Sequence, residues 1–194
     1  MDHGIHSLFE RLNHELHKTC EKLSFTYTRR RDNSVKISIL YNAIDASYIQ
    51  LDPPKEGEIV LEFSRTSTPF QKKNLNKCLR YLAAMIASMQ KCYLVSNAIN
   101  WVSLYTMSSI FEEDCEIKTP IGEFEPRRLS IQECKDLVRD APDHSVTSRV
   151  NTSDYDKFER KLFEAIPTLR CKDLGGTRKH KRRKLYSRKY AYSK

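Results

Sequence analysis

The chain of 194 residues is long enough for one well-packed domain, and its 39% hydrophobic and 30% charged residues are typical of a globular protein rather than a disordered one. No apolar run approaches the roughly 20 residues that cross a bilayer, and the first residues lack the pattern of a secretory signal. The net charge of +9 is confined to residues 178–194, which hold nine Lys or Arg and no acid, whereas residues 1–177 carry 25 basic and 25 acidic side chains.

The cysteines are scattered along the chain without the paired spacing of a metal site or a redox motif. They are Cys20, Cys78, Cys92, Cys115, Cys134 and Cys171. Because several fall on apolar faces of predicted elements, we expect reduced, buried thiols in an intracellular protein, located in the cytoplasm, the nucleus or a virion. The histidines of the first 20 residues have no second ligand cluster elsewhere, so no metal site is predicted.

The first part of the chain predicts one helix followed by strands. Apolar residues recur at helical spacing from Ile5 to Leu23, which indicates an amphipathic helix over residues 4–22. The next segments alternate apolar and polar residues, as half-buried strands do. The predicted strands lie at 25–28, 35–41, 47–51 and 58–63. The last of them has apolar residues on both faces and is therefore expected to be central in a sheet.

The clearest helix is predicted at residues 71–90. Its apolar stripe consists of Leu75, Cys78, Leu79, Leu82 and Ile86. A short strand at 93–95 follows, and then a second helix that runs to about residue 110 with Ser96 or Asn97 as its cap. A polar loop between a strand and a long helix is where many folds bind phosphate, because the first amides of a helix lack partners within it.

The last third predicts a hairpin and two more helices. CEIKTPIGEFEP at 115–126 has extended pieces around Pro120 and Gly122. Ser130 and Glu133 form a capping box before one helix, and apolar residues at helical spacing mark another over 155–166. The residues between these helices, 140–153, are predicted to form a loop.

This order of elements resembles the GCN5-related N-acetyltransferase (GNAT) family over about residues 35–124. The resemblance implies an α/β fold with a mixed, mostly antiparallel sheet flanked by helices. The parts expected are an N-terminal helix packed on the domain (1–24), a GNAT-like core (25–125), a helical extension (126–174) and a disordered basic tail (175–194). It also implies transfer of an acetyl group from acetyl-coenzyme A to an amine of unknown identity. No membrane partner is expected, because the sequence has no apolar run long enough to cross a bilayer.

QKKNLN at 71–76 is similar to the phosphate loop of that family. The family motif begins with Gln or Arg, has Gly three residues later, and has Gly or Ala five residues after the first position. Gln71, Asn74 and Asn76 take these places, and asparagine tolerates positive φ better than other non-glycine residues. Unpaired amides at the helix start would then bind the pyrophosphate of acetyl-coenzyme A. The resemblance assigns the cofactor contacts to Gln71, Lys72, Lys73, Asn74, Leu75, Asn76 and Asn100.

The catalytic residues that the resemblance implies are Glu58 and Tyr105. In the family, a tyrosine seven residues after an asparagine protonates the leaving thiolate. Counted from Asn100 that position is Met107, and counted from Asn97 or Ala98 it is Leu104 or Tyr105, so the register is open. Glu58 resembles a base in the strand before the phosphate loop, although its separation from Gln71 is two residues longer than in the family.

Residues 178–194 support a second function. Nine cations interleaved with tyrosines are typical of non-specific nucleic-acid binding, and RKHKRRK also fits a nuclear-import signal. The candidate contacts are Arg178, Lys179, Lys181, Arg182, Arg183, Lys184, Arg188 and Lys189. A Gly-Gly pair before such a segment resembles the tails of proteins from large nucleocytoplasmic DNA viruses. The alternative is therefore a catalytically inactive, GNAT-like protein, associated with nucleic acid or structural in a virion, that acts through this tail.

Overall fold

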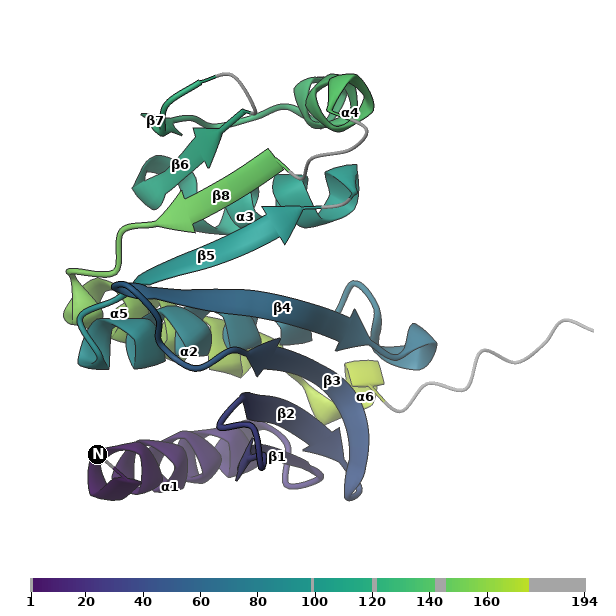
Figure 1. Ribbon diagram of the computed structural model, residues 1–194. Helices are drawn as coiled ribbons and strands as arrows, with labels where there is room; N and C mark the ends of the chain where they lie inside the picture. The colour runs from purple at the N-terminus through teal and green to yellow at the C-terminus, as the bar shows by residue number, and fades with distance from the viewer. Residues whose placement is uncertain (1, 99, 120–121, 142–145, 175–194) are drawn as a thin grey trace, which may run out of the picture.

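The computed structural model describes residues 2–98, 100–119, 122–141 and 146–174. In these parts of the chain the strands form one eight-stranded sheet in the order β1-β2-β3-β4-β5-β8-β6-β7 (Figure 1). The strands are β1 (Leu23–Arg29), β2 (Val35–Tyr41), β3 (Ile44–Leu51), β4 (Glu58–Thr66), β5 (Tyr93–Ala98), β6 (Cys115–Lys118), β7 (Glu125–Pro126) and β8 (Val146–Val150). Only β4 and β5 pair in parallel, so the predicted fold class, a mixed and mostly antiparallel sheet with helices, is confirmed.

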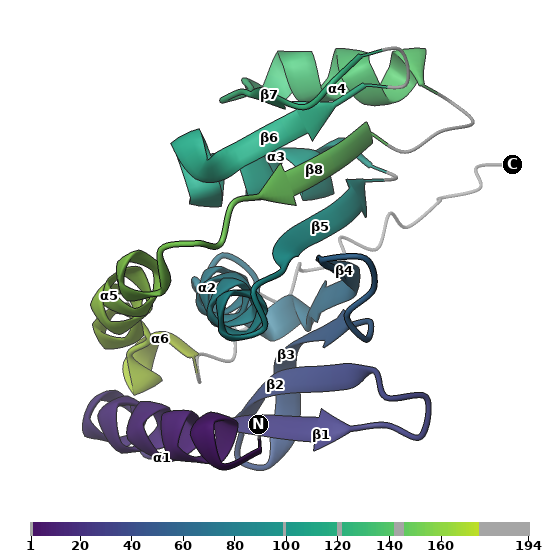
Figure 2. The ribbon, with the colours of Figure 1, turned by 60° about the vertical axis from the view of Figure 1, so that its left-hand side comes forward.

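The helices lie mainly beside the β1–β5 part of this sheet. They are α1 (Asp2–Thr19), α2 (Leu75–Met89), α3 (Trp101–Phe111), α4 (Ile131–Asp140), α5 (Tyr155–Ala165) and α6 (Cys171–Leu174), with short 3₁₀ turns η1 (Thr68–Phe70), η2 (Glu112–Asp114) and η3 (Ile166–Thr168). Figure 2 shows α2 between α5 and the sheet, with α1 alongside β1. None of the described helices is long and apolar enough to cross a bilayer.

Local sequence explains the antiparallel half of the sheet. The β2–β3 connection is the two residues Asn42 and Ala43, which have φ values of 50° and 64°, as a tight hairpin turn with two left-handed positions requires. The outer edge of β1 is protected by α1: the side chain of Asn13 donates to the carbonyl of Phe25 at 3.0 Å and accepts from its N–H at 2.6 Å. Such pairing removes exposed backbone groups that invite association at a sheet edge.

Cys20 and Cys171 form a disulfide, with an Sγ–Sγ distance of 2.00 Å. The prediction of six reduced thiols is therefore wrong for this pair, which connects the end of α1 to the start of α6. The bonded cysteines are 151 residues apart in sequence, and only the packing of α1 against η3 brings them together. The other four cysteines, Cys78, Cys92, Cys115 and Cys134, are free and buried.

Strand β8 lies in the segment predicted to be a loop. Val146, Ser148 and Val150 are buried at alternate positions, and β8 inserts between β5 and β6. Its five residues include only two large apolar ones, so its alternation was too weak to recognise, although two neighbouring strands bury it. The extension 126–174 is consequently not purely helical, because one of its strands completes the sheet.

Candidate functional site

The parallel strands β4 and β5 separate partway along their length. They pair only from Glu58 and Tyr93 to Val60 and Val95. Beyond these residues β4 pairs with β3 alone and β5 with β8 alone, and Figure 1 shows the two strands diverging as a V. Residues 61–66 and 96–98 therefore face a gap without a strand partner across it, which leaves backbone donors and acceptors available along its edges.

A cleft of about 410 Å³ occupies this gap. It is lined by Leu61, Glu62, Phe63, Ser64 and Thr66 from β4, Asn76 and Arg80 from α2, Ser96 and Asn97 from β5, Asn100 at the N-cap of α3, and Val102, Ser103 and Thr106 from α3. Phe63 and Val102 are about half exposed, at 49% and 52%, whereas Arg80 and Ser96 are each only 2% exposed. The cleft thus has exposed apolar side chains and a deep, polar interior.

The loop before α2 leaves the start of that helix open. Lys72 and Asn74 have φ values of 61° and 60°, so Asn74 adopts the left-handed conformation that glycine takes most readily. Asn74 is the N-cap residue but makes no side-chain cap, and the first bond into the helix runs from the Cys78 N–H to the Asn74 carbonyl at 3.1 Å. The Asn74 side chain donates to Thr168 Oγ1 of η3 at 3.3 Å, and the preceding amides of α2 lack partners in the helix and form the positive end of its dipole.

Arg80 is the charged residue deep in the cleft. Its Nε donates to Asn76 Oδ1 at 2.7 Å, and Asn76 Nδ2 in turn donates to Ser64 Oγ at 2.5 Å. One terminal nitrogen contacts Met107 Sδ. In the described part of the chain no carboxylate forms an ion pair with Arg80. Burial lowers the pKa of Arg80 to about 10, so the guanidinium stays charged at neutral pH.

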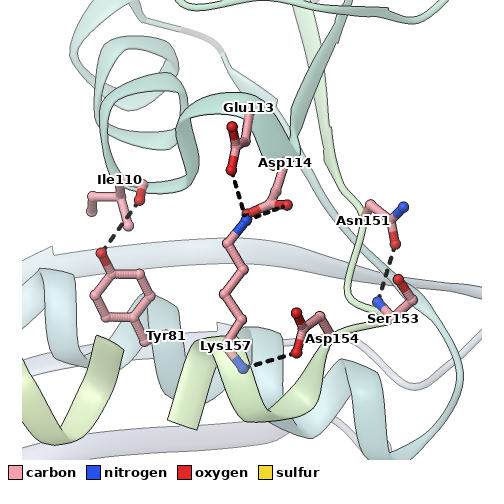
Figure 3. Close-up of polar contacts among 8 residues, drawn as sticks. All are labelled: Tyr81, Ile110, Glu113, Asp114, Asn151, Ser153, Asp154 and Lys157. Carbon is pink, nitrogen blue, oxygen red and sulfur yellow. Dashed lines mark hydrogen bonds and ion pairs between the residues drawn. The ribbon is translucent and has the colours of Figure 1, made fainter. Parts of the chain in front are cut away.

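Polar contacts connect α3 to α2, and η2 to α5, behind the cleft (Figure 3). Tyr81 Oη donates to the Ile110 carbonyl at 3.3 Å. Lys157 Nζ lies 3.0 Å from Glu113 Oε1 and 2.7 Å from Asp114 Oδ2. The hydrogen bond to Asp114 raises the pKa of Lys157, and burial opposes that effect. These contacts join α3 to α2, and they join η2, which directly follows α3, to α5.

The structure separates the predicted cofactor residues into two groups. Asn76 and Asn100 line the cleft, and Asn100 also caps α3 by accepting from the Ser103 N–H at 2.9 Å. This cap lies three or four residues after the predicted one at Asn97 or Ser96, because β5 continues to Ala98. The remaining predicted residues form the loop and helix start outside the cleft lining: Gln71, Lys72, Lys73, Asn74 and Leu75. The α2 helix correspondingly begins at Leu75, later than the predicted residue 71.

The two predicted catalytic residues do not line the cleft. Glu58 is at the paired start of β4, where its backbone also bonds to Lys55, and Tyr105 is half-buried on a side of α3 that packs against the core. The carboxylate that does line the cleft is Glu62, which accepts a hydrogen bond from Gln50 Nε2 at 2.5 Å. The predicted nucleic-acid contacts, Arg178 to Lys189, lie outside the described residues.

Sequence reasoning missed both charged residues of the cleft. A signal for Arg80 existed, because CLRYLAAM places one cation inside an otherwise buried helical run, and a charge is rarely buried without a purpose. No comparable signal distinguished Glu62 from Glu58. Both alternate with apolar residues along β4, and only the end of the β4–β5 pairing at Val60 separates them.

Comparison with solved structures finds acetyltransferases of the GNAT family. A Staphylococcus aureus member aligns with a TM-score of 0.44 and 11% identity, covering 62% of this chain and 69% of that one. Tetrahymena GCN5 aligns with a TM-score of 0.43 and 14% identity, over 63% of this chain and 71% of that one. A Desulfovibrio desulfuricans protein assigned to the family aligns with a TM-score of 0.32 and 15% identity, over 34% of this chain. The alignment covers 43% of that protein, which is less than two thirds of its length. No protein-family model and no curated protein matches the sequence.

Proposed function

We propose that this protein transfers an acyl group from a coenzyme A thioester, with acetyl-coenzyme A as the reference donor, to an amine. The observation that carries the proposal is the cleft between β4 and β5, together with the open start of α2 beside it. A coenzyme A thioester has a diphosphate at one end of a long amide-bearing arm and the reactive thioester at the other. A gap between diverging strands that adjoins a helix N-terminus offers a place to each of these parts.

The residues present fit the diphosphate and the arm of such a ligand. The unpaired amides of α2 and the positive end of its dipole favour a diphosphate, and Lys72 and Lys73 add charge nearby. Along the cleft, the free backbone edges of β4 and β5 can pair with the amides of an extended arm as another strand would. Asn76 departs from the family pattern, since its side chain bridges α2 to Ser64 where that pattern has Gly or Ala.

The chain also offers a group for the proton transfer that amide formation requires. When bound, the donor supplies a thioester whose C–S bond breaks, with the electron pair leaving on sulfur, as the amine nitrogen bonds to the carbonyl carbon. Glu62 is placed to accept the proton released from that nitrogen, since it lines the cleft and Gln50 orients its carboxylate. Glu58 and Tyr105 stay predictions from the family resemblance.

Replacement of Asn74 by Glu tests the diphosphate site. The new carboxylate would stand at the N-cap of α2 and repel phosphate, so we expect acetyl-coenzyme A to bind the original protein with micromolar affinity and the Asn74→Glu variant at least tenfold more weakly. Isothermal titration calorimetry measures both affinities. Asn42→Glu is the matched control, because Asn42 is also an exposed asparagine with positive φ but lies in the β2–β3 turn.

The control separates a local effect from a general one. If the Asn42→Glu variant binds acetyl-coenzyme A as tightly as the original protein, the loss of affinity in Asn74→Glu is specific to the helix start. No detectable heat from the original protein at millimolar acetyl-coenzyme A would remove the proposed function altogether.

A second candidate function rests on the charge of residues 178–194, which hold nine Lys or Arg and no acid. We propose that this segment binds nucleic acid without sequence preference through phosphate contacts. Deletion of the segment should abolish salt-sensitive binding to duplex DNA, measured by fluorescence anisotropy across a salt series. Before deletion the log–log salt slope should be no steeper than about −8, since each cation can neutralise at most one phosphate. An unchanged affinity and slope after deletion would exclude this function for the segment.

A further inference from the structure

We infer that the buried interior of the cleft selects acyl groups that end in a carboxylate, and that Arg80 is the residue that recognises them. This inference rests on the proposed function, because it concerns the acyl part of the coenzyme A thioester. It goes beyond that function by naming the class of donor, a dicarboxylic acyl thioester such as succinyl-coenzyme A, in place of the neutral acetyl group.

Burial places Arg80 in the interior of the cleft. Its side chain lines the cleft and is 2% exposed, whereas Lys72 and Asn74, in the loop where the diphosphate is proposed to bind, are exposed and lie outside the cleft lining. A ligand that enters with its diphosphate at the α2 start would therefore present its acyl end, rather than its diphosphate, to this guanidinium.

The hydrogen bonds of Arg80 leave part of the guanidinium available. An arginine side chain carries five N–H donors, and the contacts found are one to the Asn76 amide oxygen and one to the Met107 sulfur. Neither acceptor is charged. The remaining donors can form the paired, parallel hydrogen bonds that a guanidinium makes with a carboxylate.

The charge of Arg80, unpaired in the described residues, favours an anionic ligand over a neutral one, since Glu62, the other charged residue of the cleft, is exposed and bonds to Gln50. Arg80 is 2% exposed and has no ion pair in the described residues, and a buried charge is costly unless a partner compensates it. A bound acetyl group would seal the cleft and leave the cation uncompensated. A terminal carboxylate would supply the missing counter-charge at the place where water is excluded.

Isothermal titration of the full chain with three ligands tests this selectivity. Coenzyme A, acetyl-coenzyme A and succinyl-coenzyme A share the diphosphate and the arm and differ only at the acyl end. We expect succinyl-coenzyme A to bind about tenfold to a hundredfold more tightly than acetyl-coenzyme A, the gain typical of hydrogen bonds between charged groups. Free succinate, titrated alone, should bind far more weakly, because it lacks the contacts of the arm.

Variants on α2 assign the selectivity to one side chain. Arg80→Met should abolish the preference for succinyl-coenzyme A over acetyl-coenzyme A. Arg80→Lys, which keeps the charge but loses the paired donors, should retain only a small part of this preference. Lys77→Met is the matched control, since it removes the same charge from an exposed position three residues away that lies outside the cleft. Its preference should equal that of the original protein.

The possible failures are distinguishable. Equal binding of succinyl- and acetyl-coenzyme A by the original protein would overturn the inference and leave the proposed function standing. A preference that survives in Arg80→Met would overturn the role of Arg80. Absence of binding by coenzyme A and both of its thioesters would remove the proposed function and this inference with it.

Discussion

Replacement of both Cys20 and Cys171 by serine is expected to lower the free energy of unfolding by about 2–5 kcal/mol. The disulfide connects residues 151 positions apart, and a cross-link over a long loop restricts the unfolded chain more than one over a short loop. The loss should be measured by urea denaturation at equilibrium, with the variant and the original protein compared under oxidising conditions.

Two comparisons make this result specific. Cys92→Ser changes a free, buried thiol that already donates to the Gln90 carbonyl, so it should cost about 1 kcal/mol or less, as mild substitutions do. Addition of a reductant to the original protein should shift its unfolding midpoint towards that of the double variant. An original protein with the same midpoint in oxidising and reducing conditions would show that the Cys20–Cys171 bond contributes nothing to stability.

Replacement of Arg80 by Met is expected to stabilise the protein by about 1–3 kcal/mol. The side chain is buried without a carboxylate in the described residues, and burial lowers the pKa of Arg80 to about 10, so the folded state holds the charged form less favourably than the unfolded state does. The charge therefore costs stability at neutral pH, and a well-packed apolar side chain of similar length removes that cost. A stabilising substitution in a binding cleft is what a stability–function trade-off predicts.

The pH dependence of the unfolding free energy tests whether the charge of Arg80 destabilises the folded protein. The folded-state pKa of Arg80 lies below its unfolded value, so the cost of the charge is fully present below pH about 10 and declines as the pH rises through that value. The difference in unfolding free energy between Arg80→Met and the original protein should therefore shrink above pH about 10. A variant that is less stable than the original at neutral pH would contradict this description and assign Arg80 a structural role.

Sequence patterns predicted most of this fold because its elements are locally consistent. The apolar stripe of α2, the alternation of β2 and β4 and the capping box of α4 each specify one element without reference to the rest of the chain. The phosphate-loop motif located the start of α2 to within a few residues. It also anticipated the positive φ of Asn74, because the motif requires a left-handed position there.

The missed features depend on distant parts of the chain. β8 is short and weakly patterned, and it is a strand because β5 and β6 flank it. The Cys20–Cys171 bond depends on how α1 and α6 pack, which no spacing of cysteines reveals. Glu62 rather than Glu58 reaches the cleft only because the β4–β5 pairing ends at Val60. Sequence periodicity reports which face a residue occupies, but not where two strands separate.

Hydrogen exchange with and without acetyl-coenzyme A tests most directly whether the cleft between β4 and β5 is the coenzyme A site. The backbone edges of residues 61–66 and 96–98 and the first amides of α2 have no partners in the sheet or helix on that side. Saturating ligand should therefore slow exchange in peptides that cover these residues, and leave the β1–β2 hairpin unchanged. Protection confined to other parts of the chain, or no protection at saturation, would contradict the assignment of this cleft.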